Sequence, residues 1–202
     1  MTLLDSPTKD EAFATARKAM IDSQLRTSGV TDPVVVGRMR EVKREEFVPE
    51  SAKGVAYMDR AVPLGDGKYL AAPIVQGMLL QEAKPGLDES AIVVDGGSGY
   101  LAELLRPLVA SLKVMSVEEA LAPARGGKKV DLIIVDGAIE QLPDSLAKRL
   151  ADDGRIVTGM VHDGVTSIAR GRKSSKQVVF MPLGEVGIPR LSAFDKPKGW
   201  SF

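Results

Sequence analysis

The hydrophobic pattern of the chain changes near residue 90, and its first part has the spacing of helices. Apolar residues recur every three or four positions in residues 13–20 and again in residues 35–42. Thr8 stands three residues before Glu11, which is the capping-box spacing that marks a helix start. Residues 1–58 are therefore expected to form an N-terminal helical segment.

The next stretch, residues 59–89, carries Pro63, Gly65 and Gly67, which interrupt regular structure. Pro73 is placed to occupy the first turn of a helix, where its missing N–H costs nothing. We expect a connector that contains one helix.

From residue 90 to residue 202, apolar runs alternate with helical stretches. The run at residues 91–94 is continuous, as in a strand buried on both faces. Strands are also predicted at 113–117, 131–135 and 155–159, helices at 101–109 and 144–150, and a final antiparallel hairpin at 165–169 and 177–181 around the basic run 170–173. This order predicts an α/β, Rossmann-like domain with a mostly parallel sheet. The whole chain is expected to be one compact unit.

The segment between the second and third predicted strands is short. The twelve residues from Glu119 to Val130 cannot hold a full helix, a strand and their turns.

The amino-acid composition argues against several classes of function. The 27 basic and 27 acidic residues cancel, which argues against a nucleic-acid or membrane surface built on bulk charge. The chain has no cysteine and one histidine, His162, so disulfides, thiol catalysis and cysteine or multi-histidine metal sites are excluded. No metal is expected. The chain shows neither a signal-peptide pattern nor an apolar run of roughly 18 residues, so a cytoplasmic location is expected.

The turn after the first predicted strand, Asp95 to Tyr100, is the candidate cofactor loop. Gly97 and Gly99 allow a ligand to approach the backbone, and Glu118 follows the second strand, where an acid can bind ribose hydroxyls. Asp95 before the glycines favours S-adenosylmethionine over a dinucleotide. Asp95 could bind that cofactor or cap the following helix, and Glu118 could instead be a solvated residue at a helix start. Asp136, at the end of the third predicted strand, could face a ligand or be a turn residue.

Several stretches also carry a family resemblance. They are Met20–Pro33, Arg44–Pro49, Tyr57–Gly65, Val94–Tyr100, Leu132–Ala138, Leu150–Val157 and Phe194–Phe202. These stretches are similar to the sequences of protein-L-isoaspartate O-methyltransferases, and the last looks like a divergent, shortened alphaproteobacterial-type branch. The resemblance covers nearly the whole chain.

This resemblance implies a class I methyltransferase fold and a protein-repair activity. The family has a further helix and strand between the second and third predicted strands, so the resemblance implies that one strand and helix unit is missing after residue 119. The reaction is methyl transfer from S-adenosylmethionine to the α-carboxyl group of an isoaspartyl residue in a peptide or protein. The resemblance implies that Asp95, Gly97, Glu118 and neighbouring residues bind the cofactor. It places Asp59 in a family segment near the substrate cleft. It also places Ala71 at the position of the family's catalysis-associated serine, so the hydroxyl group is absent.

Two further functions remain open from the sequence alone. The shortened segment after residue 119 and Ala71 are compatible with a degenerate methyltransferase that acts as a binding, scaffold or homo-oligomeric module. The pattern Gly97-x-Gly99-x-x-Ala102 is also compatible with a nicotinamide-dependent oxidoreductase.

Overall fold

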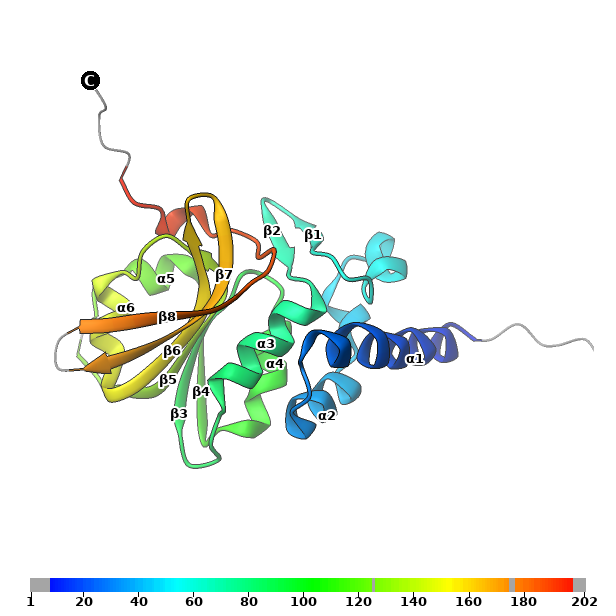
Figure 1. The fold of residues 1–202 in the computed structure, drawn as a ribbon, viewed down its shortest axis with the longest axis horizontal. Helices are drawn as coiled ribbons and strands as arrows, with labels where there is room; N and C mark the ends of the chain where they lie inside the picture. Colours follow the sequence, from blue (N-terminus) through cyan, green and yellow to red (C-terminus); the bar gives the residue numbers. More distant parts are fainter. Residues whose placement is uncertain (1–7, 125, 175–176, 198–202) are drawn as a thin grey trace, which may run out of the picture.

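A six-stranded sheet forms the centre of the structure (Figure 1), a computed structural model that describes residues 8–124, 126–174 and 177–197. The strand order is β4-β3-β5-β6-β7-β8. The strands are β3 (Ser90–Val94), β4 (Ser111–Met115), β5 (Val130–Ile139), β6 (Leu150–His162), β7 (Val165–Ser174) and β8 (Gln177–Glu185). The first four are parallel, and β7 and β8 extend the sheet in antiparallel fashion. The expected Rossmann-like sheet with a final antiparallel hairpin is thus confirmed.

Helices cover both faces of this sheet. They are α1 (Lys9–Met20), α2 (Pro33–Glu41), α3 (Pro73–Ala83), α4 (Tyr100–Leu105), α5 (Val117–Leu121) and α6 (Asp144–Arg149). Figure 1 shows α3 and α4 on one face with α1 and α2 outside them, and α5 and α6 on the other. No helix of the described residues is long and apolar enough to cross a membrane.

The two faces of β3 show why its sequence is a continuous apolar run. Ala91 and Val93 belong to the core under α3 and α4, whereas Ile92 and Val94 belong to the core under α5 and α6. Every second residue of a strand points to the same face, so a strand covered on both sides needs apolar residues throughout. The apolar run at residues 91–94 is therefore explained by the helices on both sides of β3.

The helix signals of the N-terminal segment are confirmed. Thr8 accepts a hydrogen bond from the Glu11 amide at 3.3 Å, and the Glu11 carboxylate accepts one from the Thr8 amide at 2.8 Å. The first segment continues through a π-helical turn (Ile21–Leu25) and short 3-10 helices (Arg26–Ser28, Arg44–Phe47 and Glu50–Val55). Its apolar residues share one core with α3 and β3.

Three features differ from or extend the sequence-based expectations. A two-stranded hairpin, β1 (Val62–Gly65) with β2 (Lys68–Leu70), forms within the predicted connector. The basic run 170–173 is not the tip of the last hairpin but part of β7, where Lys173 is buried and donates to the Leu150 carbonyl at 2.6 Å. Between β4 and β5 the described residues contain α5 and no strand, so β4 is an edge of the sheet.

Candidate functional site

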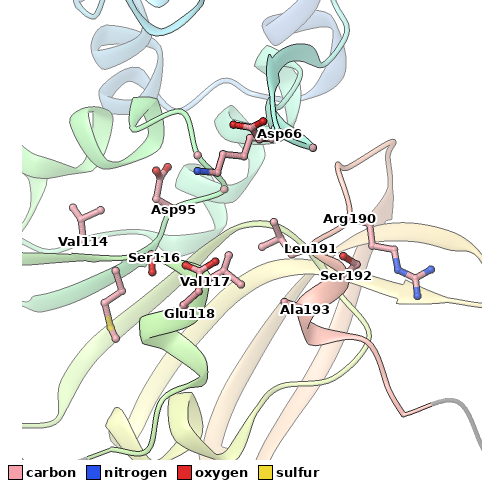
Figure 2. Close-up of a pocket in the computed structure, with 15 residues that line it drawn as sticks. Asp66, Asp95, Val114, Ser116, Val117, Glu118, Arg190, Leu191, Ser192 and Ala193 are labelled. Atoms are coloured by element: carbon pink, nitrogen blue, oxygen red, sulfur yellow. The ribbon is translucent and has the colours of Figure 1, made fainter.

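A cleft of about 340 Å³ opens beside the carboxyl ends of β3 and β4. Four segments line it: residues 66–68, 95–97, 114–118 and 190–193. Figure 2 shows Asp66 and Glu118 on opposite sides of this cleft, with Leu191 and Ser192 on a third. The carboxyl edge of a parallel sheet is the usual place for ligands in open α/β folds. The cleft therefore lies where the sequence predicted a cofactor loop.

The glycines of the loop after β3 are required by close packing. A Cβ at Gly96 would overlap the backbone carbonyl oxygen of Asp136 on β5. A Cβ at Gly97, where φ is +116°, would lie 2.7 Å from the Lys68 side chain. The loop is therefore held between β5 and the β1–β2 hairpin, and side chains larger than hydrogen do not fit at these two positions.

Asp95 fixes the end of this loop. One oxygen of its carboxylate accepts a hydrogen bond from the Gly99 amide at 2.9 Å, directly before α4. Gly99 has φ +73°, and it does not line the cleft. Asp95 thus holds the amide that directly precedes α4, although α4 itself has no side-chain cap, and its place in the cleft lining leaves it able to contact a ligand as well.

Glu118 and Glu119, adjacent in sequence, have different surroundings. The Glu119 carboxylate accepts a hydrogen bond from the Ser116 amide at 2.8 Å and completes the capping box at the start of α5. Glu118 is exposed and lines the cleft, and the Ser116 hydroxyl, the largest influence, lowers its pKa. Glu118, rather than Glu119, is available to a ligand in its charged form.

Asp136 lies directly beneath the loop in a buried network. It belongs to β5 rather than to a turn, and it does not line the cleft. The side-chain amide of Gln76 donates to its carboxylate at 3.1 Å, and the Gln76 oxygen accepts from Arg44 at 2.6 Å. Burial, and after it the charge of Asp95, raises the pKa of Asp136 to about 7. A carboxyl group that titrates near neutrality therefore supports the loop from Asp95 to Tyr100, called the glycine loop below.

Arg44, fully buried, ties the network to the segment that precedes α3. Its guanidinium donates to the carbonyl oxygens of Ala56, at 2.6 Å, and Ala71. Ala71 is itself buried, and neither Ala71 nor the exposed Asp59 lines the cleft. Ala71 contributes its backbone to the fold below the cleft, and Asp59 lies in the connector.

The segment after β8 returns to the sheet and forms one wall of the cleft. The Ala138 amide donates to the Pro189 carbonyl at 2.8 Å, and the Leu191 amide donates to the Ala138 carbonyl at 2.9 Å. A Cβ at Gly137 would lie 2.5 Å from the Leu191 side chain, so this wall packs directly on β5. The wall joins residues that are about fifty positions apart in the chain.

Two cleft segments, residues 66–68 and 190–193, were not among the predicted site residues. The Asp66-Gly67 pair is a recognised hairpin signal, and it could have placed Lys68 on a turn at the sheet edge. The 190–193 segment has no periodicity that would signal its position. His162, by contrast, is exposed at the turn between β6 and β7, where it contacts Asp163 at 3.1 Å outside the cleft.

Comparison with known proteins shows which family of sequences this chain resembles. The family model described as protein-L-isoaspartate(D-aspartate) O-methyltransferase matches residues 15–124. Protein-L-isoaspartate O-methyltransferase 1 of Rhodopseudomonas palustris (strain HaA2) is 30% identical, covering 75% of this chain and 72% of the relative. The enzyme of the same name from Methanoculleus marisnigri (strain ATCC 35101 / DSM 1498 / JR1) is 28% identical, covering 91% of this chain and 93% of the relative.

The fold is similar to a solved structure as well. The crystal structure of a protein described as a protein-L-isoaspartate O-methyltransferase from Plasmodium falciparum, in complex with S-adenosyl-L-homocysteine, superposes with a TM-score of 0.67. The sequences are 19% identical, and the match covers 89% of this chain and 97% of the other. At this identity the likeness concerns the fold.

Proposed function

Because the chain belongs to the protein-L-isoaspartate(D-aspartate) O-methyltransferase family, we propose that it methylates a carboxyl group of isoaspartyl residues in proteins, with S-adenosylmethionine as the methyl donor. The observation that carries the proposal is the family match over residues 15–124. This match includes three of the four segments that line the cleft: residues 66–68, 95–97 and 114–118.

The residues of the cleft fit this methyl donor. The volume of about 340 Å³ lies within the range of small-molecule sites, which is roughly 300–1,000 Å³. Gly96 and Gly97 line the cleft without side chains of their own, and Gly97 is exposed. Asp95, Gly97 and Glu118 would hold the donor, with Gly99 and Asp136 shaping the loop from outside the cleft. When bound, S-adenosylmethionine supplies an electrophilic methyl group.

The chain's own contribution to the reaction is positioning. A carboxylate is already a nucleophile at neutral pH, so the reaction needs no general base, and an exposed His162 outside the cleft is no obstacle. Rigid placement of two reactants can supply about 7–11 kcal/mol of a reaction barrier. The hydrogen bond from the Gly99 amide to Asp95 and the Arg44–Gln76–Asp136 network hold the loop for this purpose. The Ala71 side chain cannot donate a hydrogen bond and does not line the cleft, so orientation of the acceptor falls to the side chains that do.

The alternative of a binding or scaffold module receives no support from these observations. That hypothesis expects a cleft filled by side chains or collapsed, whereas the cleft here is open. The nicotinamide alternative depends on Gly97, Gly99 and Ala102 alone. Ala102 is buried in α4 and does not line the cleft.

The test pairs binding with turnover. Isothermal calorimetry with S-adenosylhomocysteine measures the donor site, and transfer of a labelled methyl group to an isoaspartyl peptide measures the reaction. The same peptide with normal aspartate is the matched control and should remain unlabelled. Failure to bind S-adenosylhomocysteine together with no transfer to the isoaspartyl peptide would refute the proposal.

A further inference from the structure

The side chains that line the cleft leave one cation without an acidic partner. Three carboxylates line the cleft, those of Asp66, Asp95 and Glu118. Of the two cations in the lining, Arg190 is held by Glu140 and by Asp195, the latter at 2.8 Å. Among the described residues of the lining, Lys68 is the one cation for which the structure has no ion pair.

The backbone places Lys68 directly over the glycine loop. It begins β2, immediately after the turn at Asp66 and Gly67, whose φ angles are +50° and +71°. Three carbons of its side chain lie within 2.7–2.9 Å of the position that a Gly97 Cβ would take. The stem of Lys68 therefore packs on the bare backbone of Gly97, and this packing holds the side chain inside the cleft.

The head group of Lys68 remains available to a ligand. Lys68 is exposed, so its ammonium group is solvated rather than engaged in the core. Its charge acts across the cleft, where it adds to the effect of the Ser116 hydroxyl in lowering the pKa of Glu118. An ammonium group has three donors and attracts an anion strongly where competing water is reduced.

We propose that Lys68 is a specificity-determining residue that binds a carboxylate group in the cleft. This inference rests on the proposed function, which brings two carboxylates to the site: that of the amino-acid end of the methyl donor and that of the isoaspartyl acceptor. The three acids of the lining would repel either of them, and Lys68 supplies the opposite charge. The shared chemistry is one ammonium–carboxylate contact beside Gly97.

The experiment uses three variants of the full chain. Lys68→Met keeps the stem that packs on Gly97 and removes the charge, and Lys68→Arg keeps the charge. Lys113→Met removes a cation from the exposed part of β4, outside the cleft lining, and serves as the matched control. For each, calorimetry measures the Kd of S-adenosylhomocysteine and of an isoaspartyl peptide separately, and a transfer assay measures KM and kcat.

The two sources of the carboxylate give different results. If Lys68 binds the donor, Lys68→Met weakens S-adenosylhomocysteine binding about tenfold, which is about 1.4 kcal/mol, and leaves the peptide Kd unchanged. If Lys68 binds the acceptor, the Kd and KM of the peptide rise about tenfold while S-adenosylhomocysteine binding is retained. In both cases Lys68→Arg restores most of the affinity.

Equal affinities for Lys68→Met and Lys113→Met would overturn the proposal, and so would a wild-type chain that binds neither carboxylate ligand. A wild-type chain that binds a ligand through Lys68 but transfers no methyl group would refute the proposed function and support the carboxylate site. A Lys68→Met chain with normal Kd, KM and kcat would support the proposed function and refute the carboxylate site. The two hypotheses therefore fail separately.

Discussion

Gln76 donates a hydrogen bond from its side-chain amide to the buried carboxylate of Asp136, at 3.1 Å. The oxygen of the same side chain accepts from Arg44 at 2.6 Å. All three side chains are buried, so Gln76 links a buried guanidinium to a buried carboxylate. The glycine loop lies directly above this chain of contacts, because Gly96 packs on the backbone of Asp136.

Replacement of Gln76 by leucine should destabilise the fold strongly. Leucine has a similar size but leaves Arg44 and Asp136 buried without this partner. Loss of one partner from a buried charged network costs about 3 kcal/mol. Urea unfolding at pH 7 measures the change. Gln141→Leu is the control. The Gln141 side chain is exposed and donates to the Asp195 carbonyl at 3.1 Å, so its loss should cost less than about 1 kcal/mol. Equal losses for both variants would contradict the structural role of Gln76.

Asp136 should make the stability of the protein depend on pH. Its pKa is raised from 3.8 to about 7 by burial first and the charge of Asp95 second. Between these values the folded chain binds more protons than the unfolded chain, so its free energy of unfolding falls as pH rises. The stabilising contribution is complete below pH 3.8 and is lost as pH rises through about 7.

Asp136→Asn removes this titration and keeps an oxygen that accepts from Gln76. Urea unfolding at intervals from pH 4 to pH 8 should show a drop on the order of 4 kcal/mol in the wild type and a flatter profile in the variant. The same slope in both proteins would show that Asp136 does not titrate in this window.

Gly96→Ala should weaken ligand binding in the cleft. The added Cβ would overlap the Asp136 carbonyl oxygen, which is backbone and cannot rotate away, so the loop must move. Binding of S-adenosylhomocysteine should weaken at least about tenfold, or about 1.4 kcal/mol. Gly37→Ala is the matched control, because nothing lies within 4 Å of its Cβ position in α2. This helical substitution should leave binding unchanged and add about 0.5–1 kcal/mol of stability.

Two substitutions separate the roles of Asp95. Asp95→Asn keeps an oxygen to accept from the Gly99 amide, and Asp95→Ala does not. Since we assign Asp95 both a loop hydrogen bond and a ligand contact, both variants should weaken S-adenosylhomocysteine binding. Only the alanine variant should lose about 1 kcal/mol of stability, the usual net value of one hydrogen bond. Unchanged binding in Asp95→Asn would reduce Asp95 to a structural residue.

The elements that the sequence predicted are those whose signals are local. The apolar run at residues 91–94 needs no knowledge of its neighbours, because a strand covered on both faces has no polar face. The Thr8 and Glu11 capping box lies within one helical turn. The loop at Asp95 follows from a strand, a set of glycines and a helix in succession. All three therefore appear in the structure close to their predicted places.

The remaining site features depend on contacts between distant residues. Lys68 enters the cleft because a short hairpin carries it onto Gly97, some thirty positions later in the chain. The basic run at residues 170–173 was misplaced because charge suggested a hairpin tip. In β7, Arg170 and Arg172 share one side and the buried Lys173 donates to the Ala147 and Leu150 carbonyls. The position of Asp136 under the loop likewise reflects the pairing of β3 with β5.

The position of the 190–193 wall late in the chain affects when the cleft can form during synthesis. A ribosome releases the chain from its N-terminus, so this wall is made after every strand of the sheet on which it packs. A nascent chain that has completed β8 can already pair its strands, yet the Leu191 contact with Gly137 has still to form. The cleft is thus completed only after all six strands of the sheet have been synthesised, and a ligand that needs all of its walls distinguishes finished molecules from unfinished ones.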